Sequence, residues 1–412
     1  MTVTVPRHAR TLTLFEDPAR PLRLAGGGAL TRVPVAYERY GPPPADAEGT
    51  VFVCHALTGD SHVARHDDTD APGWWDAMVG PRRPLDTDRY HVICANVLGG
   101  CSGTAGPAPA PAATPPGFPV PFPAVTVADM VTVHRELLRR LGVGRLHAVV
   151  GGSLGGMQAL EWLLRHPGDA GRYALIATAA RLSADNLAYN AIGRAAIRAD
   201  PRYAGGRYDP QEPPDTGLGI ARMIGHLTYM SAPSLETKFA RRLSPPTTAT
   251  GATSGGYTAA PARGPFAVER YMEYQGEKLA GRFDANSYLY LTAAMDAFDA
   301  FATPYDAAAL AGADVHLFSF GSDRLFGYDH SRHIAARLAK AGVDCPHFHE
   351  ESAPAGHDAF LMDVPAYLQA VRRWLTAPVP APAATAGRGG STVRPRALMP
   401  ASHGPRRSQE SP

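Results

Sequence analysis

The chain has 412 residues, of which 45% are hydrophobic and 19% are charged. A chain of this length and composition can bury a sizeable core, which excludes a disulfide-stapled miniprotein and an intrinsically disordered protein. Its 40 basic and 38 acidic residues leave a net charge of +2. This balance creates no field for nucleic acid or for an anionic membrane, so we expect neither as a partner.

The sequence also lacks the marks of export and membrane insertion. Its first residues carry no apolar segment of a secretory leader, and no window of about eighteen residues is apolar throughout. The four cysteines are widely spaced and form no C-x-x-C pair. We therefore expect a soluble, cytoplasmic protein with reduced thiols.

Four continuous apolar runs predict strands that are buried on both faces, as in a parallel sheet. They span residues 50–56, 91–97, 146–152 and 314–320. Alternation at residues 32–40 predicts an exposed antiparallel strand, and residues 127–142 predict a helix that a glycine ends. Strands that alternate with helices predict an α/β fold with a mostly parallel central sheet flanked by helices.

The region 181–301 breaks this alternation. The helices that we predict there span residues 218–230, 267–280 and 286–298. They surround a polar loop at residues 244–264. We interpret the region as a helical lid insertion, which divides an α/β core formed by residues 1–180 and 302–376.

Two further segments are rich in proline and small residues. The first, at residues 107–123, predicts an extended loop, because proline at that density joins neither helices nor sheets. The second, at residues 377–412, predicts a disordered tail.

The strongest chemical signal is the sequence GGSLGG at residues 151–156. It fits the pattern G-x-S-x-G, directly after a predicted buried strand and directly before a predicted helix. In this context the pattern indicates a nucleophile elbow, a sharp turn that strains the serine backbone and leaves no room for nearby Cβ atoms. Ser153 is therefore the candidate nucleophile, and the amide of Leu154 is a candidate oxyanion donor. Without its context, the pattern would also fit a glycine-rich phosphate cradle.

A serine in such an elbow needs a base and a carboxylate, which follow it in the order Asp, then His. Asp323 comes just after the predicted strand at residues 314–320, and His357 follows a later apolar stretch. Both lie at the carboxyl ends of strands, where open α/β sheets place their sites. The sequence thus predicts a triad of Ser153, Asp323 and His357.

Other histidines and cysteines suggest alternatives that we do not favour. Two histidine pairs have close spacing, namely His62 with His66 and His347 with His349. Neither pair carries a metal-binding pattern, and the second pair has no obvious carboxylate partner, so we predict no metal site. Cys54 and Cys101 lie near the predicted site, but a buried cysteine more often serves as a small hydrophobic residue.

Several long segments resemble one known family. They are CHALTGDSHVA at residues 54–64, the segment at 73–107, FPAVTVADMV, VVGGSLGGMQALEW at 149–162, IARMIGHLTYMS at 220–231 and GHDAFL. In this order they resemble the homoserine O-acetyltransferases of the α/β-hydrolase superfamily. The resemblance runs from about residue 12 to residue 375 and fades in the loops. It implies an α/β-hydrolase fold, a homodimer and a role in methionine biosynthesis.

The resemblance implies the same triad that the residues predict. It adds the backbone amide of Leu57, in HALTG, as the second oxyanion donor beside that of Leu154. It also makes Arg222 and Asp358 the substrate-binding residues. Homoserine is a zwitterion whose carboxylate suits a guanidinium and whose ammonium suits a carboxylate, so its site needs one of each.

The reaction so implied is a ping-pong transfer of an acetyl group to the hydroxyl of L-homoserine through an acyl-serine. Acetyl-CoA is the co-substrate, and no permanently bound cofactor is expected. By the same resemblance, relatives that use succinyl-CoA carry an arginine two residues after the triad aspartate. Here that position is Leu325, which favours acetyl, although Arg324 stands one position earlier.

Several alternatives stay open at this point. The same pattern fits a succinyl-CoA-dependent homoserine or serine O-acyltransferase and a deacetylcephalosporin C acetyltransferase. A plain serine esterase would share the triad, but it would not need Arg222 or Asp358. A non-catalytic binding module is a further class, which usually loses a member of the triad.

Overall fold

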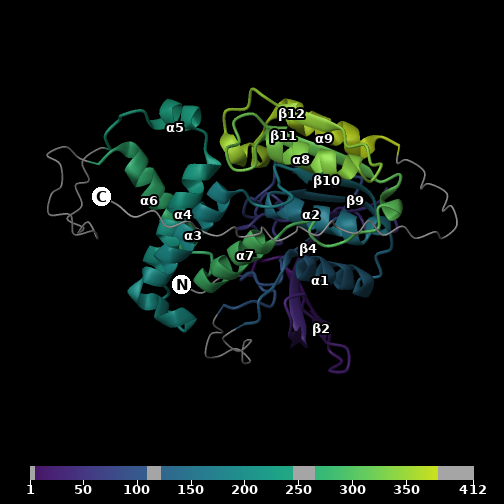
Figure 1. Ribbon diagram of the computed structural model, residues 1–412, viewed down its shortest axis with the longest axis horizontal. Coiled ribbons are helices and arrows are strands. Elements are labelled where there is room, and N and C mark those ends of the chain that lie inside the picture. The colour runs from purple at the N-terminus through teal and green to yellow at the C-terminus, as the bar shows by residue number, and fades with distance from the viewer. Residues whose placement is uncertain (1–4, 109–121, 245–264, 379–412) are drawn as a thin grey trace, which may run out of the picture.

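A computed structural model describes residues 5–108, 122–244 and 265–378 of the chain (Figure 1). A central sheet contains eight strands: β1 (Arg10–Leu14), β4 (Val33–Tyr40), β5 (Thr50–Cys54), β8 (His91–Ala95), β9 (Leu146–Gly152), β10 (Ala170–Ile176), β11 (Asp314–Phe320) and β12 (His347–Glu350). Their order in the sheet is β1-β4-β8-β5-β9-β10-β11-β12. Strand β4 runs antiparallel to both β1 and β8, and all other neighbours are parallel.

The remaining elements are short strand pairs and helices. Strand β2 (Leu22–Arg23) pairs with β3 (Ala29–Leu30), and β6 (Val79–Gly80) pairs with β7 (Leu85–Asp86). The α-helices are α1 (Val127–Arg140), α2 (Leu154–Arg165), α3 (Ala184–Ala199), α4 (Asp215–Tyr229), α5 (Ala232–Phe239), α6 (Ala267–Ala280), α7 (Ala285–Ala297), α8 (Tyr328–Ala339) and α9 (Pro365–Thr376). Within the described ranges, no helix combines the length and the apolar character needed to cross a membrane.

The predicted α/β fold with its mostly parallel sheet is confirmed. The predicted strands at 146–152 and 314–320 coincide with β9 and β11, and the predicted helix at 267–280 coincides with α6. The predicted loops at 107–123 and 244–264 and the predicted tail at 377–412 fall almost entirely outside the described residues.

The antiparallel strand predicted at residues 32–40 is present as β4, but the prediction that it is exposed was wrong. Strand β4 is mostly buried because β1 covers its outer edge and β8 its inner edge. Its one acidic residue, Glu38, has no exposed surface. Alternation indicated a solvated face here, but the polar side chain on that face pairs with partners from a distant loop.

Strand β10 is a buried parallel strand that the apolar runs did not indicate. Arg172 interrupts its sequence, and this side chain is fully buried. One guanidinium nitrogen donates a hydrogen bond of 2.9 Å to the carbonyl of Leu375, and Asp314 lies 3.4 Å from Nε. Because these partners compensate the charge, an arginine can occupy a strand in the core.

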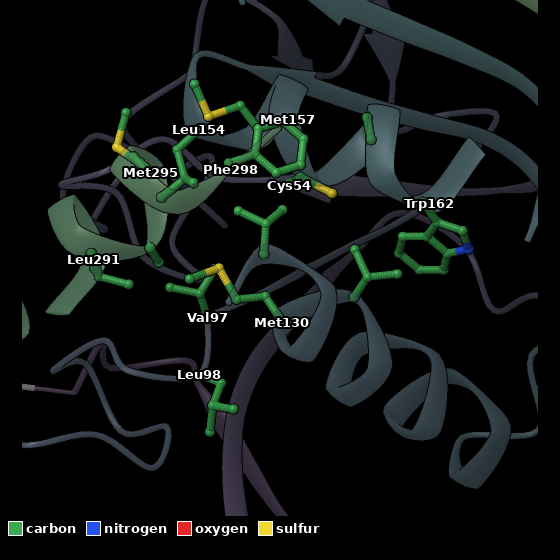
Figure 2. Close-up of a cluster of buried hydrophobic side chains, with 14 of the residues drawn as sticks. Cys54, Val97, Leu98, Met130, Leu154, Met157, Trp162, Leu291, Met295 and Phe298 are labelled. Carbon is green, nitrogen blue, oxygen red and sulfur yellow. The ribbon is translucent and has the colours of Figure 1, made fainter. Parts of the chain in front are cut away.

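Two hydrophobic clusters fill the two faces of the sheet. On β5, Phe52 and Cys54 belong to one cluster, whereas Val51 and Val53 belong to the other. Figure 2 shows part of the first cluster, where side chains of α1, α2 and α7 meet. Each aliphatic or aromatic side chain buried there contributes roughly 1.5–3 kcal/mol.

Helices α3, α4, α5 and α6 stand to one side of the sheet, while α1, α2, α8 and α9 flank it (Figure 1). Helix α4 packs between α3 and α6. It crosses α6 at Gly219 and Gly276, where a Cβ on Gly276 would lie 3.0 Å from the Gly219 carbonyl oxygen. Because both residues are glycines, the two helices can pack closely where they cross. Both helices lie within the predicted lid insertion.

Candidate active site

The turn between β9 and α2 holds Ser153 in an unusual backbone conformation, with φ 59° and ψ −123°. A positive φ at a residue with a side chain costs roughly 1–3 kcal/mol, so the surroundings must impose it. A Cβ on Gly151 would lie 2.1 Å from the Gly155 carbonyl oxygen, and a Cβ on Gly155 would lie 2.0 Å from that of Cys54. Only glycine fits at either position, which is the reason for the G-x-S-x-G pattern.

Three side chains from distant parts of the chain form one hydrogen-bonded row. Nε2 of His357 lies 3.0 Å from Oγ of Ser153, and Nδ1 of His357 lies 2.8 Å from Oδ2 of Asp323. All three residues are at most 6% exposed. The arrangement gives the serine hydroxyl a base, and it gives the base a carboxylate that orients it.

Backbone contacts fix the carboxylate of Asp323 in the turn after β11. The amides of Leu325 and Phe326 donate to Oδ1 at 2.8 and 2.9 Å, which leaves Oδ2 for His357. His357 follows Gly356, whose φ of 73° favours glycine. A Cβ on Gly356 would lie 2.5 Å from the Tyr229 carbonyl oxygen, so this turn packs directly on the end of α4.

The pKa of His357 is raised above its ordinary value of 6.5. Burial lowers this pKa, because it disfavours the imidazolium. The charge and hydrogen bond of Asp323, together with the charge of Asp358, outweigh burial. The site therefore stabilises the protonated imidazole that forms when a serine proton is taken up.

The two residues predicted to donate backbone amides to an oxyanion, Leu57 and Leu154, both lie beside Ser153. Leu154 is the first residue of α2, and an amide at that position has no partner within the helix. Leu57, in the loop after β5, lines the same cavity as Ser153. The side chain of Gln158 holds this loop, because its Nε2 donates to the carbonyl of His55 at 3.2 Å.

A cavity of about 140 Å³ opens beside Ser153, and we call it the polar cavity. Its charged and polar lining includes both predicted substrate-binding residues, Arg222 from α4 and Asp358 from the turn after Gly356. Burial raises the pKa of Asp358, although the charges of His357 and Arg222 oppose this shift. Arg222 and Asp358 thus present a cation and a carboxyl group to any molecule that enters the cavity.

A smaller cavity of about 40 Å³ also includes Ser153 in its lining, and we call it the uncharged cavity. It is lined by Leu57, Ser153, Leu182, Asn186, Tyr189, Asn190, Ile224, Gly225, Thr228, Tyr229, Tyr288, Met295, Leu325 and Phe326. None of these side chains is a cation. Leu325 is therefore part of the site, whereas the neighbouring Arg324 is exposed and lines neither cavity.

The structure adds residues that the sequence did not suggest. Tyr229 lies 5.8 Å from His357 between ring centres, and the guanidinium of Arg222 lies 5.3 Å from the centre of the same tyrosine ring. Tyr229 lies seven residues after Arg222, which is two turns along the same face of the helix. This spacing could have indicated from the sequence that Tyr229 belongs to the site. Trp74 and Arg282 also line the polar cavity, but no motif in the sequence identified them.

The histidine pairs both have carboxylate partners. His62 Nδ1 and His66 Nε2 lie 3.0 and 2.8 Å from Oε2 of the buried Glu38. The expectation that His347 and His349 lack such a partner was wrong, because Nε2 of His349 lies 2.8 Å from Glu351 Oε2. The hydrogen bond to Glu38 raises the pKa of His62 to about 9.

The cysteines near the site are poor nucleophiles. Burial raises the pKa of the Cys54 thiol strongly and that of Cys101 to about 12. Because the thiolate is the reactive form, neither competes with Ser153 at neutral pH.

Comparisons with known proteins show the family of this chain. A model of the α/β hydrolase fold family matches residues 49–364. The chain is 45% identical over 366 residues to the homoserine O-succinyltransferase of Nocardioides sp., covering 88% of this chain and 96% of that relative. It is 44% identical over 352 residues to the homoserine O-acetyltransferase of Caulobacter vibrioides, covering 84% of this chain and 89% of that relative.

A solved structure shows the same fold. The homoserine O-acetyltransferase from Bacillus anthracis matches with a TM-score of 0.76 at 24% identity, covering 90% of this chain and 98% of that chain. The sequence relatives carry the family assignment, since they align over most of both chains. This chain belongs to the homoserine O-acyltransferase family of the α/β-hydrolase fold.

Proposed function

We propose that this protein transfers an acetyl group from acetyl-CoA to the hydroxyl of L-homoserine. One observation carries the proposal: the buried row of Ser153, His357 and Asp323 opens on a cavity that contains Arg222 and Asp358. A nucleophilic serine beside a cation and a carboxylate suits acyl transfer to a zwitterionic alcohol.

In the first half-reaction, His357 takes the proton of Ser153 while Oγ attacks the thioester carbonyl. The amides of Leu57 and Leu154 stabilise the resulting oxyanion, the carbon–sulfur bond breaks, and CoA leaves as its thiol with the proton from His357. Ser153 then carries the acyl group as an ester.

In the second half-reaction, homoserine occupies the polar cavity. Arg222 binds its carboxylate and Asp358 binds its ammonium, so the γ-hydroxyl faces the acyl-serine. His357 accepts the hydroxyl proton, the new ester bond forms, and Ser153 regains its proton from His357 as it leaves. The helices of the lid insertion limit access of water, which would otherwise hydrolyse the acyl-serine.

The choice of acetyl as donor is supported by the uncharged cavity. Its lining contains no cation, and Leu325 is one of its residues. The distal carboxylate of a succinyl group would be desolvated there without a cation to pair with, which is unfavourable. Relatives with names for either donor align closely with this chain, so succinyl-CoA is the alternative donor that an experiment must compare.

We also propose a homodimer that forms through the lid insertion. Ile220 and Leu227 on α4 are 43% and 47% exposed, and Tyr274 on α6 is 56% exposed. The two residues on α4 are seven positions apart and so share one face of the helix. Sedimentation of the full chain tests this proposal, which a monomer at micromolar concentration would contradict.

The function is tested by CoA release with acetyl-CoA and succinyl-CoA, each combined with L-homoserine, L-serine or deacetylcephalosporin C. We expect the largest kcat/KM for acetyl-CoA with L-homoserine. CoA release that does not depend on any alcohol would instead indicate a plain esterase. A larger kcat/KM for another donor or alcohol would show that this compound, and not the one that we propose, is the substrate.

A further inference from the structure

The polar cavity contains a second arginine that the proposed reaction does not use. Arg282 stands between α6 and α7 and lines the cavity together with Ser153, Arg222 and Asp358. Its Nη1 donates a hydrogen bond of 2.9 Å to the carbonyl of Thr58, in the loop that carries Leu57. The residue is exposed overall, yet enough protein surrounds the guanidinium that burial lowers its pKa. The guanidinium is therefore held beside the loop that carries Leu57, in the lining of the cavity.

The cavity has more cations than carboxylates. Arg222 and Arg282 contribute two guanidinium groups, and Asp358 is the one carboxyl group among the lining residues. Within the described part of the chain, neither arginine lies within 4.0 Å of a carboxylate oxygen. Among the charges around Arg282, that of Asp60 raises its pKa and that of Arg222 lowers it, so the two guanidinium groups repel each other although Asp60 offsets part of this repulsion. An anionic group bound between them would relieve this repulsion.

We propose that Arg282 binds the carboxylate of the amino-acid acceptor together with Arg222. This inference rests on the proposed function and assigns a further substrate-binding residue to the same site. Arg222 reaches the cavity from α4, and Arg282 reaches it from the connection between α6 and α7. Two guanidinium groups from separate elements fix a carboxylate more firmly than one, which orients the hydroxyl at the other end of the acceptor.

The phosphates of CoA are not a suitable anion for this position. A long pantetheine arm separates them from the thioester, whereas Arg282 lines the same small cavity as the serine that attacks the thioester. The phosphates therefore lie outside this cavity when the thioester is at Ser153.

The carboxylate of a succinyl group is short enough to reach Arg282, but the order of events argues against it. The acyl group and the acceptor occupy the site together during the second half-reaction. An acyl chain in the polar cavity would block the place between Arg222 and Asp358 that the acceptor needs. The carboxylate beside Arg282 is thus the one that belongs to the acceptor.

The test separates the two half-reactions in Arg282→Gln, with Arg270→Ala as the control. Arg270 lies on α6 and pairs with Glu273 on the surface, away from the cavity. Acylation is followed as CoA release from acetyl-CoA and, separately, from succinyl-CoA in the absence of an alcohol. Transfer is followed with L-homoserine and with 3-aminopropan-1-ol, which has the same hydroxyl and ammonium but no carboxylate.

We expect Arg282→Gln to lower kcat/KM for L-homoserine by roughly 10- to 100-fold, as for the loss of one charged hydrogen bond. Acylation by acetyl-CoA and transfer to 3-aminopropan-1-ol stay within about twofold of the wild type, since neither involves the carboxylate. Arg282→Lys keeps a charge and recovers part of the loss. Arg270→Ala behaves as the wild type.

Three outcomes would overturn the inference. An equal loss with both alcohols would mean that Arg282 only anchors the loop at Thr58. Slower acylation by succinyl-CoA alone would assign Arg282 to the donor, and no change in any rate would leave it without a binding role. A wild-type enzyme that transfers nothing to L-homoserine would instead reject the proposed function, which distinguishes the two failures.

Discussion

The indole N–H of Trp75 donates a hydrogen bond of 2.7 Å to the carbonyl of Phe360, three residues beyond His357. The two rings also meet edge to face, with their centres 5.8 Å apart. Phe360 in turn fills the space where Gly152 has no side chain, since a Cβ there would lie 2.5 Å from its ring. A buried residue from the loop after β5 thus supports the turn that carries the histidine of the triad.

Replacing Ser153 by alanine tests the nucleophile. Because the acyl intermediate needs the serine oxygen, we expect Ser153→Ala to lower turnover by roughly four to six orders of magnitude while the fold persists. Mass spectrometry after incubation with acetyl-CoA alone should show one added acetyl group on the wild type. The same adduct on Ser153→Ala would mean that another residue is the nucleophile.

The pH dependence of kcat/KM tests the role of His357. His357 accepts the serine proton only when neutral, and its pKa is raised above 6.5, so activity should rise with pH through a midpoint above 6.5. Asp323→Asn removes a charge that raises this pKa, so the midpoint moves down and kcat falls by roughly 10⁴-fold. His357→Ala should cost more than Asp323→Asn. A wild-type profile that is flat between pH 5 and 8 would contradict this role.

Substitution of Arg222 or Asp358 should separate the two half-reactions. If these residues bind the charges of the acceptor, Arg222→Ala and Asp358→Asn raise the KM for L-homoserine steeply and leave acylation by acetyl-CoA nearly unchanged. Rapid-mixing measurement of CoA release with and without the acceptor distinguishes the steps. Equal damage to both steps in a folded Arg222→Ala protein would show a structural role instead.

The donor prediction depends on Leu325 in the uncharged cavity. Leu325→Arg introduces a cation into that cavity, so we expect the ratio of kcat/KM for succinyl-CoA to that for acetyl-CoA to rise by at least tenfold. Arg324→Ala is the matched comparison, because the exposed Arg324 lines neither cavity. A wild-type preference for succinyl-CoA that Arg324→Ala abolishes would show that both the residue and the donor were chosen wrongly.

The pair of Glu38 and His62 should make stability depend on pH. Burial raises the pKa of Glu38, but hydrogen bonds from His62, His66 and Tyr40 outweigh it and lower this pKa to about 2. The stabilisation from Glu38 is therefore present above pH 4.5 and lost as pH falls toward 2.

For His62 the direction is opposite. Its pKa is raised to about 9, so its contribution is complete below pH 6.5 and is lost as pH rises through 9. Urea unfolding at a series of pH values should show a maximum between these limits. Glu38→Gln should lower the free energy of unfolding by roughly 1–3 kcal/mol and flatten both limbs. If the free energy of unfolding of Glu38→Gln falls at low and at high pH as steeply as that of the wild type, other groups cause the pH dependence.

The sequence by itself determined the class of fold and the identity of the candidate triad. Parallel strands are buried on both faces and therefore consist of continuous apolar residues. For this reason β9 and β11 could be predicted from their apolar runs alone. The elbow could be predicted because its strained turn at Ser153 and the contact between Gly151 and Gly155 are local, whereas Gly155 is required by Cys54, about a hundred residues away in the sequence. Where the physical requirement is local, the order of residues along the chain reveals it.

The tertiary structure decided what depends on distant segments. Glu38 and Arg172 are buried because partners from other parts of the chain compensate their charges, and neither partner is visible beside them in the sequence. In the same way, Arg282 joins the polar cavity only because α6 and α7 bring it to the loop at Thr58. Charged groups interact through space, so their roles became clear only once the fold had placed their partners around them.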